Sequence, residues 1–209
     1  PPGMLGAVAE AIDDPTMPMR VLAGLGDVDS AAPSFALWEL SRLVRGDGEL
    51  SAVFDEGIDG LLNRLETLDS PNAQQFRDDF DNFVYEYGSR GPNEWELSAH
   101  TWETDPSIPL RTLDQVRKQP DEKNPQNGAD NASEDRQQVV EEVRKKLAEV
   151  GNDELIGVFE GALVGANQMV FRERAKTSLV RVLHESRMAI RELGKRHTDS
   201  GTVNDPEHI

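Results

Sequence analysis

Apolar residues recur at helical spacing along most of the chain, and strand-like alternation is nearly absent. Ser70-Pro71 is a typical helix start, and Phe76, Phe80 and Phe83 then mark one face of a helix that Gly88 is expected to cap. The same reasoning predicts helices over residues 4–12, 33–44, 49–57, 58–68 and 110–117. The pattern therefore predicts an all-α fold with many helices.

The C-terminal part predicts two longer helices. Ser133 is expected to cap a helix that ends at Val150, and residues 155–196 continue for about 40 residues without a proline. Core packing is preferred over a cofactor groove for the apolar stripe on this last helix, so we expect it to pack against Val139, Val143 and Leu147 as a long helical hairpin. The stripe comprises Phe171, Ala175, Leu179, Val182, Ser186, Ala189 and Leu193.

Two segments lack helical periodicity. Residues 120–135 contain no strongly apolar side chain and have the composition of a linker. Residues 89–109 carry Trp95 and Trp102, so we expect an irregular loop whose aromatic side chains are packed. The predicted organisation is an N-terminal helical part with this loop (1–118), a flexible linker (119–135) and the C-terminal hairpin (136–209).

Composition excludes several classes of protein. The 209 residues carry a formal charge of −17, which argues against a nucleic-acid partner. No cysteine is present, so disulfides, thiolate metal sites and cysteine nucleophiles are excluded. No apolar run reaches the roughly 18 residues that cross a bilayer. We therefore expect a cytoplasmic protein without a membrane partner.

The charge is unevenly distributed, because residues 172–196 hold eight basic and three acidic side chains within an acidic chain. Two interpretations remain open. The basic helix either forms salt bridges with the acidic body, or Arg172 and Lys176, four residues apart, bind a phosphate or carboxylate.

Known catalytic motifs are absent from the sequence. It contains no phosphate-binding G-x-x-x-x-G-K-[ST] loop, and its four histidines lack metal-ligand spacing, so we predict no catalytic residue and no metal site. One segment, Tyr87–Leu97 (YGSRGPNEWEL), presents Arg90, Glu94 and Glu96 on a backbone restricted by two glycines and a proline. It predicts either a polar site or a buried ion pair.

Three segments share sequence motifs with a known family. Residues 87–106, YGSRGPNEWELSAHTWETDP, are close to a Y-G-x-R-x-P-x-E motif followed by W-x-x-D-P. Residues 22–44 and 172–209, the latter with R-E-x-x-[RK] and E-L-G-[RK]-R, agree with the same family in order. The chain thus resembles the phosphoenolpyruvate-utilising phosphotransferases, which include phosphoenolpyruvate synthase, pyruvate phosphate dikinase and rifampicin phosphotransferase.

The resemblance implies a multidomain enzyme that uses ATP and magnesium. In that family an ATP-grasp domain phosphorylates a histidine on a swivelling domain, which carries the phosphoryl group to the acceptor. Neither motif occurs in this chain, and none of its histidines has the sequence context of a carrier. We therefore expect a helical acceptor-binding or connecting domain of a longer polypeptide, which binds no cofactor itself, is inactive alone, and has a small-molecule acceptor and those two domains as partners.

By the same resemblance, the substrate-binding residues are expected at Arg90, Glu94, Glu96, Arg172 and Lys176. Arg90 and Arg172 are suited to hold an anionic group, and Glu94 to orient or deprotonate an acceptor hydroxyl. This hypothesis predicts that Arg172 or Lys176 lies close to the Tyr87–Leu97 loop. The alternative is a non-catalytic scaffold in which Arg90 and Glu94 are buried and paired, without a pocket between the helices. An independent small-molecule enzyme ranks third.

Overall fold

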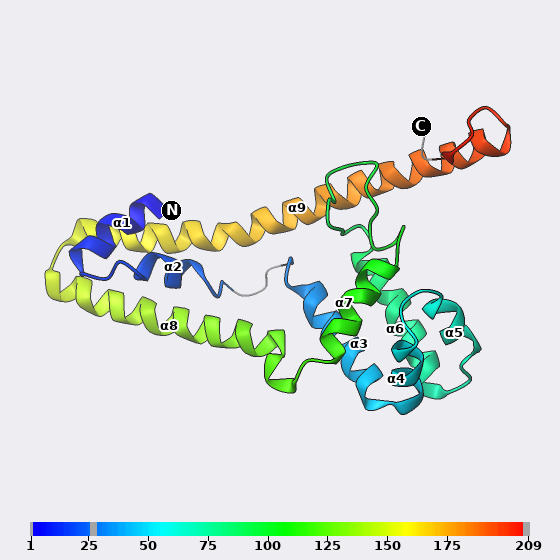
Figure 1. Ribbon diagram of the computed structural model, residues 1–209. Helices are drawn as coiled ribbons and strands as arrows, with labels where there is room; N and C mark the ends of the chain where they lie inside the picture. Colours follow the sequence, from blue (N-terminus) through cyan, green and yellow to red (C-terminus); the bar gives the residue numbers. More distant parts are fainter. Residues whose placement is uncertain (1, 26–28, 207–209) are drawn as a thin grey trace. The chain divides into compact units, whose positions relative to one another are not determined.

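The computed structural model describes residues 2–25 and 29–206 (Figure 1). Across those ranges every regular element is a helix, which confirms the predicted all-α fold. Residues 26–28 and 207–209, which belong to the first and third segments of the family resemblance, lie outside the described residues. No helix in the described part of the chain is long and apolar enough to cross a membrane.

The helices group into two compact units that are discontinuous in sequence. Residues 1–32 and 120–175 form the first unit, and residues 33–119 and 176–209 form the second. The longest helix contributes its first part to one unit and the remainder to the other. In chain order the elements are α1 (Pro2–Ala11), α2 (Met17–Leu22), α3 (Ala32–Gly46), α4 (Gly48–Asp55), α5 (Leu61–Thr67), α6 (Pro71–Tyr87), α7 (Ser107–Arg117), a 3-10 turn (Asp121–Lys123), α8 (Pro125–Val150) and α9 (Asp153–Asp199).

Helix α8 begins earlier than the sequence predicted. The side chain of Asn124 accepts a hydrogen bond from the Gln126 amide at 2.9 Å, and Pro125 occupies the first turn, so the cap at Ser133 was wrong. Residues 125–135 are thus helical rather than extended linker. Their side chains are mostly exposed, and an exposed first stretch of helix has the same polar composition as a linker.

The first unit has an aliphatic core built by α1, α2, α8 and the start of α9. Gly24, at φ +60°, touches the α8 backbone at Ala132 so closely that a Cβ would overlap it, and the Arg20 guanidinium donates to Asp135 at 3.0 Å. These contacts attach the α2 end of the unit to α8. The buried residues are Leu5, Val8, Ala9, Met17, Val21, Val139, Val140, Val143, Leu147, Phe159, Ala162 and Leu163.

The predicted hairpin of α8 and α9 is present, but the stretch of α9 predicted to pack on α8 was wrong. Val139, Val143 and Leu147 pack in one cluster with residues 159–163, at the start of α9. The stripe from Phe171 to Leu193 is exposed. Because α8 has 26 residues and the connecting turn is short, only about the first 26 residues of α9 can lie beside it. Residues further along α9 have no α8 residue opposite them.

The second unit is built around an aromatic row on α6. This helix begins as predicted, with the Ser70 side chain accepting a hydrogen bond from the Ala73 amide at 3.2 Å. The Phe80 and Phe83 rings lie 6.0 Å apart, and Phe83 stacks on Trp102 of the following loop at 5.5 Å. The predicted packing of a loop aromatic is therefore confirmed for Trp102. Leucines and valines of α3–α5 and α7 complete this core.

The loop between α6 and α7 is irregular, as predicted, and its backbone is locally fixed. The Trp102 amide donates to the Arg90 carbonyl at 2.8 Å, and the Glu103 amide donates to the Gly88 carbonyl at 3.0 Å. A Cβ at Gly91 would lie 2.8 Å from the His100 carbonyl oxygen, so only glycine allows this approach. The two halves of the loop are thus held against each other.

Candidate functional site

Three of the predicted site residues lie together in the second unit. The Arg90 Nε lies 2.7 Å from one carboxylate oxygen of Glu94, and the Lys176 Nζ lies 3.2 Å from the other. The Arg90 and Glu94 side chains are only 14% and 10% exposed. Lys176 is thus close to the loop, as the acceptor-domain hypothesis expects, while Arg90 and Glu94 are paired, as the scaffold hypothesis expects.

The other two predicted residues make different contacts. The exposed Glu96 carboxylate accepts weak hydrogen bonds from the Ser98 amide and hydroxyl at 3.4 and 3.3 Å. The exposed Arg172 belongs to the first unit and pairs with its neighbour Glu173 at 3.2 Å. Both remain predicted substrate contacts.

Arg187 of α9 binds the backbone of the loop, and this contact was not predicted from the sequence. Its side chain is fully buried. The guanidinium donates to the carbonyl oxygens of Glu94, Glu96 and Leu97 at 3.0, 2.8 and 3.2 Å. Burial, with a smaller contribution from the nearby Arg191, lowers the pKa of Arg187 from its usual value. The Tyr87–Leu97 loop is therefore built around a buried cation that binds its backbone.

His184 connects this arginine to a carboxylate. The Arg187 Nη1 lies 3.2 Å from His184 Nδ1, and because a guanidinium only donates, Nδ1 is the acceptor. The ring proton is then on Nε2, which donates to Glu103 at 2.8 Å. A Cβ at Gly88 would lie 2.9 Å from the Glu103 Cβ, so glycine is also needed at this position for the carboxylate to approach.

A signal for this chain of contacts does exist in the sequence. Val180, His184 and Arg187 follow one another at spacings of four and three residues, which places them on one helical face. The apolar stripe on the opposite face is more hydrophobic, so the sequence pattern predicts that the stripe is the buried face. A polar helix face that binds loop carbonyls has the same sequence pattern as a polar face exposed to solvent.

The Glu103–His184 pair opens onto a cavity of about 670 Å³ between α6, α9 and the loop. Four carboxylates and one guanidinium line it, and the guanidinium of Arg181 also donates to the Glu86 carbonyl at 3.1 Å. This acidic lining favours a neutral or cationic ligand over an anionic one. The lining residues are Asp81, Val84, Tyr85, Glu86, Ser89, Glu103, Arg181, His184 and Glu185.

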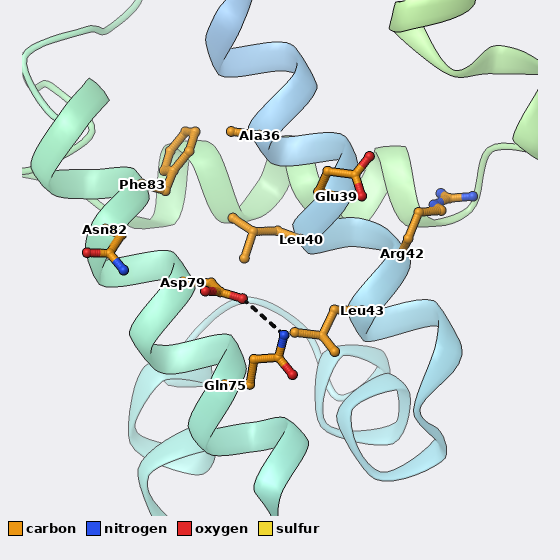
Figure 2. A pocket seen from close by; sticks show the side chains of 9 residues that line it. All are labelled: Ala36, Glu39, Leu40, Arg42, Leu43, Gln75, Asp79, Asn82 and Phe83. Carbon is orange, nitrogen blue, oxygen red and sulfur yellow. Dashed lines mark hydrogen bonds between the residues drawn. The ribbon is translucent and has the colours of Figure 1, made fainter.

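A second cavity of about 460 Å³ lies between α3 and α6 (Figure 2). Ala36, Leu40, Leu43 and Phe83 give it an apolar surface, and Glu39, Arg42, Gln75, Asp79 and Asn82 are its polar lining. The Arg42 guanidinium lies 4.1 Å above the Trp38 ring and donates to the Val116 carbonyl at 2.7 Å. Phe83 thus lines this cavity and also stacks on Trp102 of the loop.

The residues that the structure describes contain no cluster of three or more histidine, aspartate or glutamate side chains arranged to hold a metal ion. The carboxylates of the larger cavity are thus too dispersed for such a site.

Comparisons with known proteins find one family model and two curated relatives. A family model described as "Rifampicin phosphotransferase fourth domain" matches residues 4–173. The chain is 27% identical over 94 residues, 45% of its length, to the prodigiosin synthesizing transferase PigC of Serratia marcescens, and covers 11% of that protein. It is 25% identical over 199 residues, 94% of its length, to the chondramide synthase cmdD of Chondromyces crocatus, and covers 5% of it.

Because the family model spans more than half of the chain, the resemblance seen in the motifs is confirmed. The chain belongs to the rifampicin phosphotransferase fourth-domain family, a helical domain of the phosphoenolpyruvate-utilising enzymes.

Proposed function

We propose that this chain is the acceptor-binding domain of a multidomain phosphotransferase, in which a carrier histidine outside the chain delivers the phosphoryl group. The match of residues 4–173 to the fourth-domain family carries this proposal. ATP and magnesium act at an ATP-grasp domain of the same polypeptide, and this chain binds neither. Its partners are that domain, the carrier-histidine domain and a small-molecule acceptor.

The acidic cavity beside the loop is the proposed acceptor site. Its volume, about 670 Å³, lies within the range of small-molecule sites. Its carboxylates favour an uncharged or cationic acceptor, so the phosphoryl group is the negatively charged reactant.

The exposed Arg172 and Glu96 remain proposed contacts of the substrates. Arg90 and Lys176 neutralise Glu94 and help to hold the loop.

Glu103 is better suited than Glu94 to accept the proton of an acceptor hydroxyl. Both Glu94 oxygens already have a cationic partner, while Glu103 lines the cavity and is oriented by a single neutral donor, His184. As the acceptor oxygen bonds to phosphorus, its proton passes to the Glu103 carboxylate. The bond between phosphorus and the carrier nitrogen breaks, and its electron pair stays on the carrier imidazole.

The test uses the complete polypeptide that carries this domain, with ATP, magnesium and rifampicin, the substrate that the family description names. Glu103→Gln should leave binding of the acceptor within a few-fold and lower its phosphorylation by about 100-fold or more. Glu86→Gln, a carboxylate of the same cavity without the His184 contact, is the matched control. Equal phosphorylation by both variants would reject Glu103, and the lack of ATP-dependent phosphorylation of any hydroxyl compound would reject the proposal.

A second candidate function is a non-catalytic scaffold, which the buried Arg90–Glu94 pair favours. In this case the loop serves to present a stable surface to neighbouring domains. The double variant Arg90→Met/Glu94→Gln would then weaken the association of this domain with its neighbours. Calorimetry would detect no binding of a small molecule to the cavity. The acceptor-domain proposal expects binding and retained association.

A further inference from the structure

Helix α9 presents an apolar stripe that the described part of the chain leaves exposed. Its buried residues Val180, His184 and Arg187 lie on one face. At about 100° per residue, the stripe lies close to the opposite face. Leu179 and Val182 are 56% and 64% exposed. From Ala175 onward the stripe positions, Ala175, Leu179, Val182, Ser186, Ala189 and Leu193, follow the 4-3-4-3-4 spacing of a coiled-coil seam.

We infer that this seam binds a second copy of the chain, with the two α9 helices antiparallel about a twofold axis. In an antiparallel coiled coil the layers pair a large residue with a small one three times over: Leu179 with Ala189 of the second copy, Val182 with Ser186, and Leu193 with Ala175. Each layer occurs twice, as a twofold interface requires. The seam is therefore complementary to itself in shape.

The charges beside the seam fit the same orientation. One flank of α9 carries Arg174, Arg181, Glu185 and Glu192, in that order. Antiparallel pairing lays this flank along the same flank of the second copy with the order of charges reversed, so the arginines of one copy lie toward the glutamates of the other. Within the chain, Arg181 also donates to the Glu86 carbonyl and Glu192 pairs with Arg196. Parallel pairing would instead place this flank against the apolar Leu183 and Ile190 of the other helix, so the order of charges favours the antiparallel arrangement.

This inference is independent of the proposed function and has a consequence for the larger cavity. Arg181 and Glu185 line that cavity as well as the flank of the seam. A second copy docked on α9 would therefore border the cavity entrance. The residues that select the partner helix are in this way also residues of the proposed acceptor site.

The first test is the mass of the chain in solution, by sedimentation equilibrium at about 0.15 M salt, which screens the charge of −17 on each copy. We expect twice the 23.2 kDa of one chain at micromolar concentration. Val182→Glu should raise the dissociation constant by about 100-fold, because it buries a charge in the seam. Met19→Glu, at a residue that is 80% exposed on α2, should change nothing.

A single-chain mass at about 100 µM, or a dimer that Val182→Glu leaves intact, would overturn the inference. In the first case the stripe is covered by another domain of the longer polypeptide or by none. Val182 is exposed in the single chain, so at a concentration low enough for both proteins to be single chains, the thermal unfolding of the variant, followed by circular dichroism, should match that of the parent.

Disulfide cross-linking tests the register. The chain has no cysteine, so single substitutions report one position each. Val182→Cys mixed with Ser186→Cys should cross-link at least tenfold faster than either variant alone, because these two positions share a layer only in antiparallel pairing. Faster cross-linking of Val182→Cys with itself would overturn the antiparallel register.

Discussion

The two units use their arginines differently. In the first unit, Arg20 and Arg144 pair with the exposed carboxylates of Asp135 and Glu160, at 3.0 and 2.8 Å. In the second unit several arginines bind backbone carbonyls instead. Three of them bind carbonyls in or just after the last turn of a helix: Arg42 at the end of α7, Arg77 at the end of α5 and Arg64 at the end of α4. Arg187 donates to three loop carbonyls.

The difference follows from the number of helix C-termini inside each unit. Every helix leaves its last four carbonyls without an intrahelical partner, and the second unit contains several short helices and an irregular loop. The first unit contains two short helices, α1 and α2, one 26-residue helix and the beginning of another, so it has fewer such carbonyls to satisfy. At one of the short helices, α2, Arg136 donates to the Val21 carbonyl at 2.9 Å. An arginine-rich segment therefore need not be an anion site.

The largest expected effect is at Arg187. Replacement by Met would leave one buried and two partly buried carbonyls without this donor and should lower the free energy of unfolding of the second unit by about 3–5 kcal/mol. All three tryptophans lie in that unit, so urea unfolding followed by tryptophan fluorescence reports it selectively. Arg144→Met, in an exposed pair of the first unit, should change the stability by less than about 1 kcal/mol. Similar losses in both variants would remove the distinction between the units.

A smaller effect is expected from adding a methyl group at two glycines. Gly91→Ala forces a Cβ against the backbone of His100 and should cost about 1–3 kcal/mol. Gly128→Ala, in α8, meets no atom within 4 Å and should gain about 0.5–1 kcal/mol through helix propensity. Calorimetric melting curves of the two variants measure both signs. A neutral Gly91→Ala would mean that the loop accommodates a side chain.

Replacing an arginine that caps a helix of the second unit should cause a moderate loss of stability. Arg42→Met removes the donor to the Val116 carbonyl and one of two arginine donors to the Gln119 carbonyl, and we expect a loss of about 1–2 kcal/mol. Hydrogen exchange of the amides near the end of α7 should accelerate, while exchange in α8 should be unchanged. Acceleration in α8 instead would show that the effect is not local.

The smallest expected effect is the pH dependence that two exposed ion pairs give to the stability of the first unit. Hydrogen bonds from Arg20 and Arg144 lower the pKa values of Asp135 and Glu160 below their usual values. A lowered carboxyl pKa contributes stability above the unfolded-state value, near pH 4, and this contribution is lost as the pH falls further. Carbonyl acceptors do not titrate, so the contacts of Arg187 with the loop carbonyls should persist.

Urea unfolding at pH 7, 4 and 3, followed by circular dichroism, measures this loss. Asp135→Asn should remove part of the pH slope. A slope that is unchanged in Asp135→Asn would assign the acid sensitivity to other carboxylates.

Much of the local structure could be predicted from the sequence. The helix start at Ser70, the irregular loop that packs Trp102 and the family all follow from short motifs and spacing, which are local properties. Asn124-Pro125 is also a typical helix start, but the polar composition of the residues after it indicated a linker. Lys176 lies near the loop, as the acceptor-domain hypothesis expected, and Arg90 pairs with Glu94, as the scaffold alternative expected. Substrate binding by these residues stays a prediction.

The sequence by itself determined that the chain is helical, where most helices lie and which motifs it carries, because helix periodicity and capping act over a few residues. Only the tertiary structure decided which face of α9 is buried, because that depends on how far α8 reaches along it and on where the loop returns. It also decided the contacts of His184, Arg187 and Glu103. Buried polar residues that bind backbone or each other have the same sequence signature as solvated ones, and only the position of distant carbonyls distinguishes them.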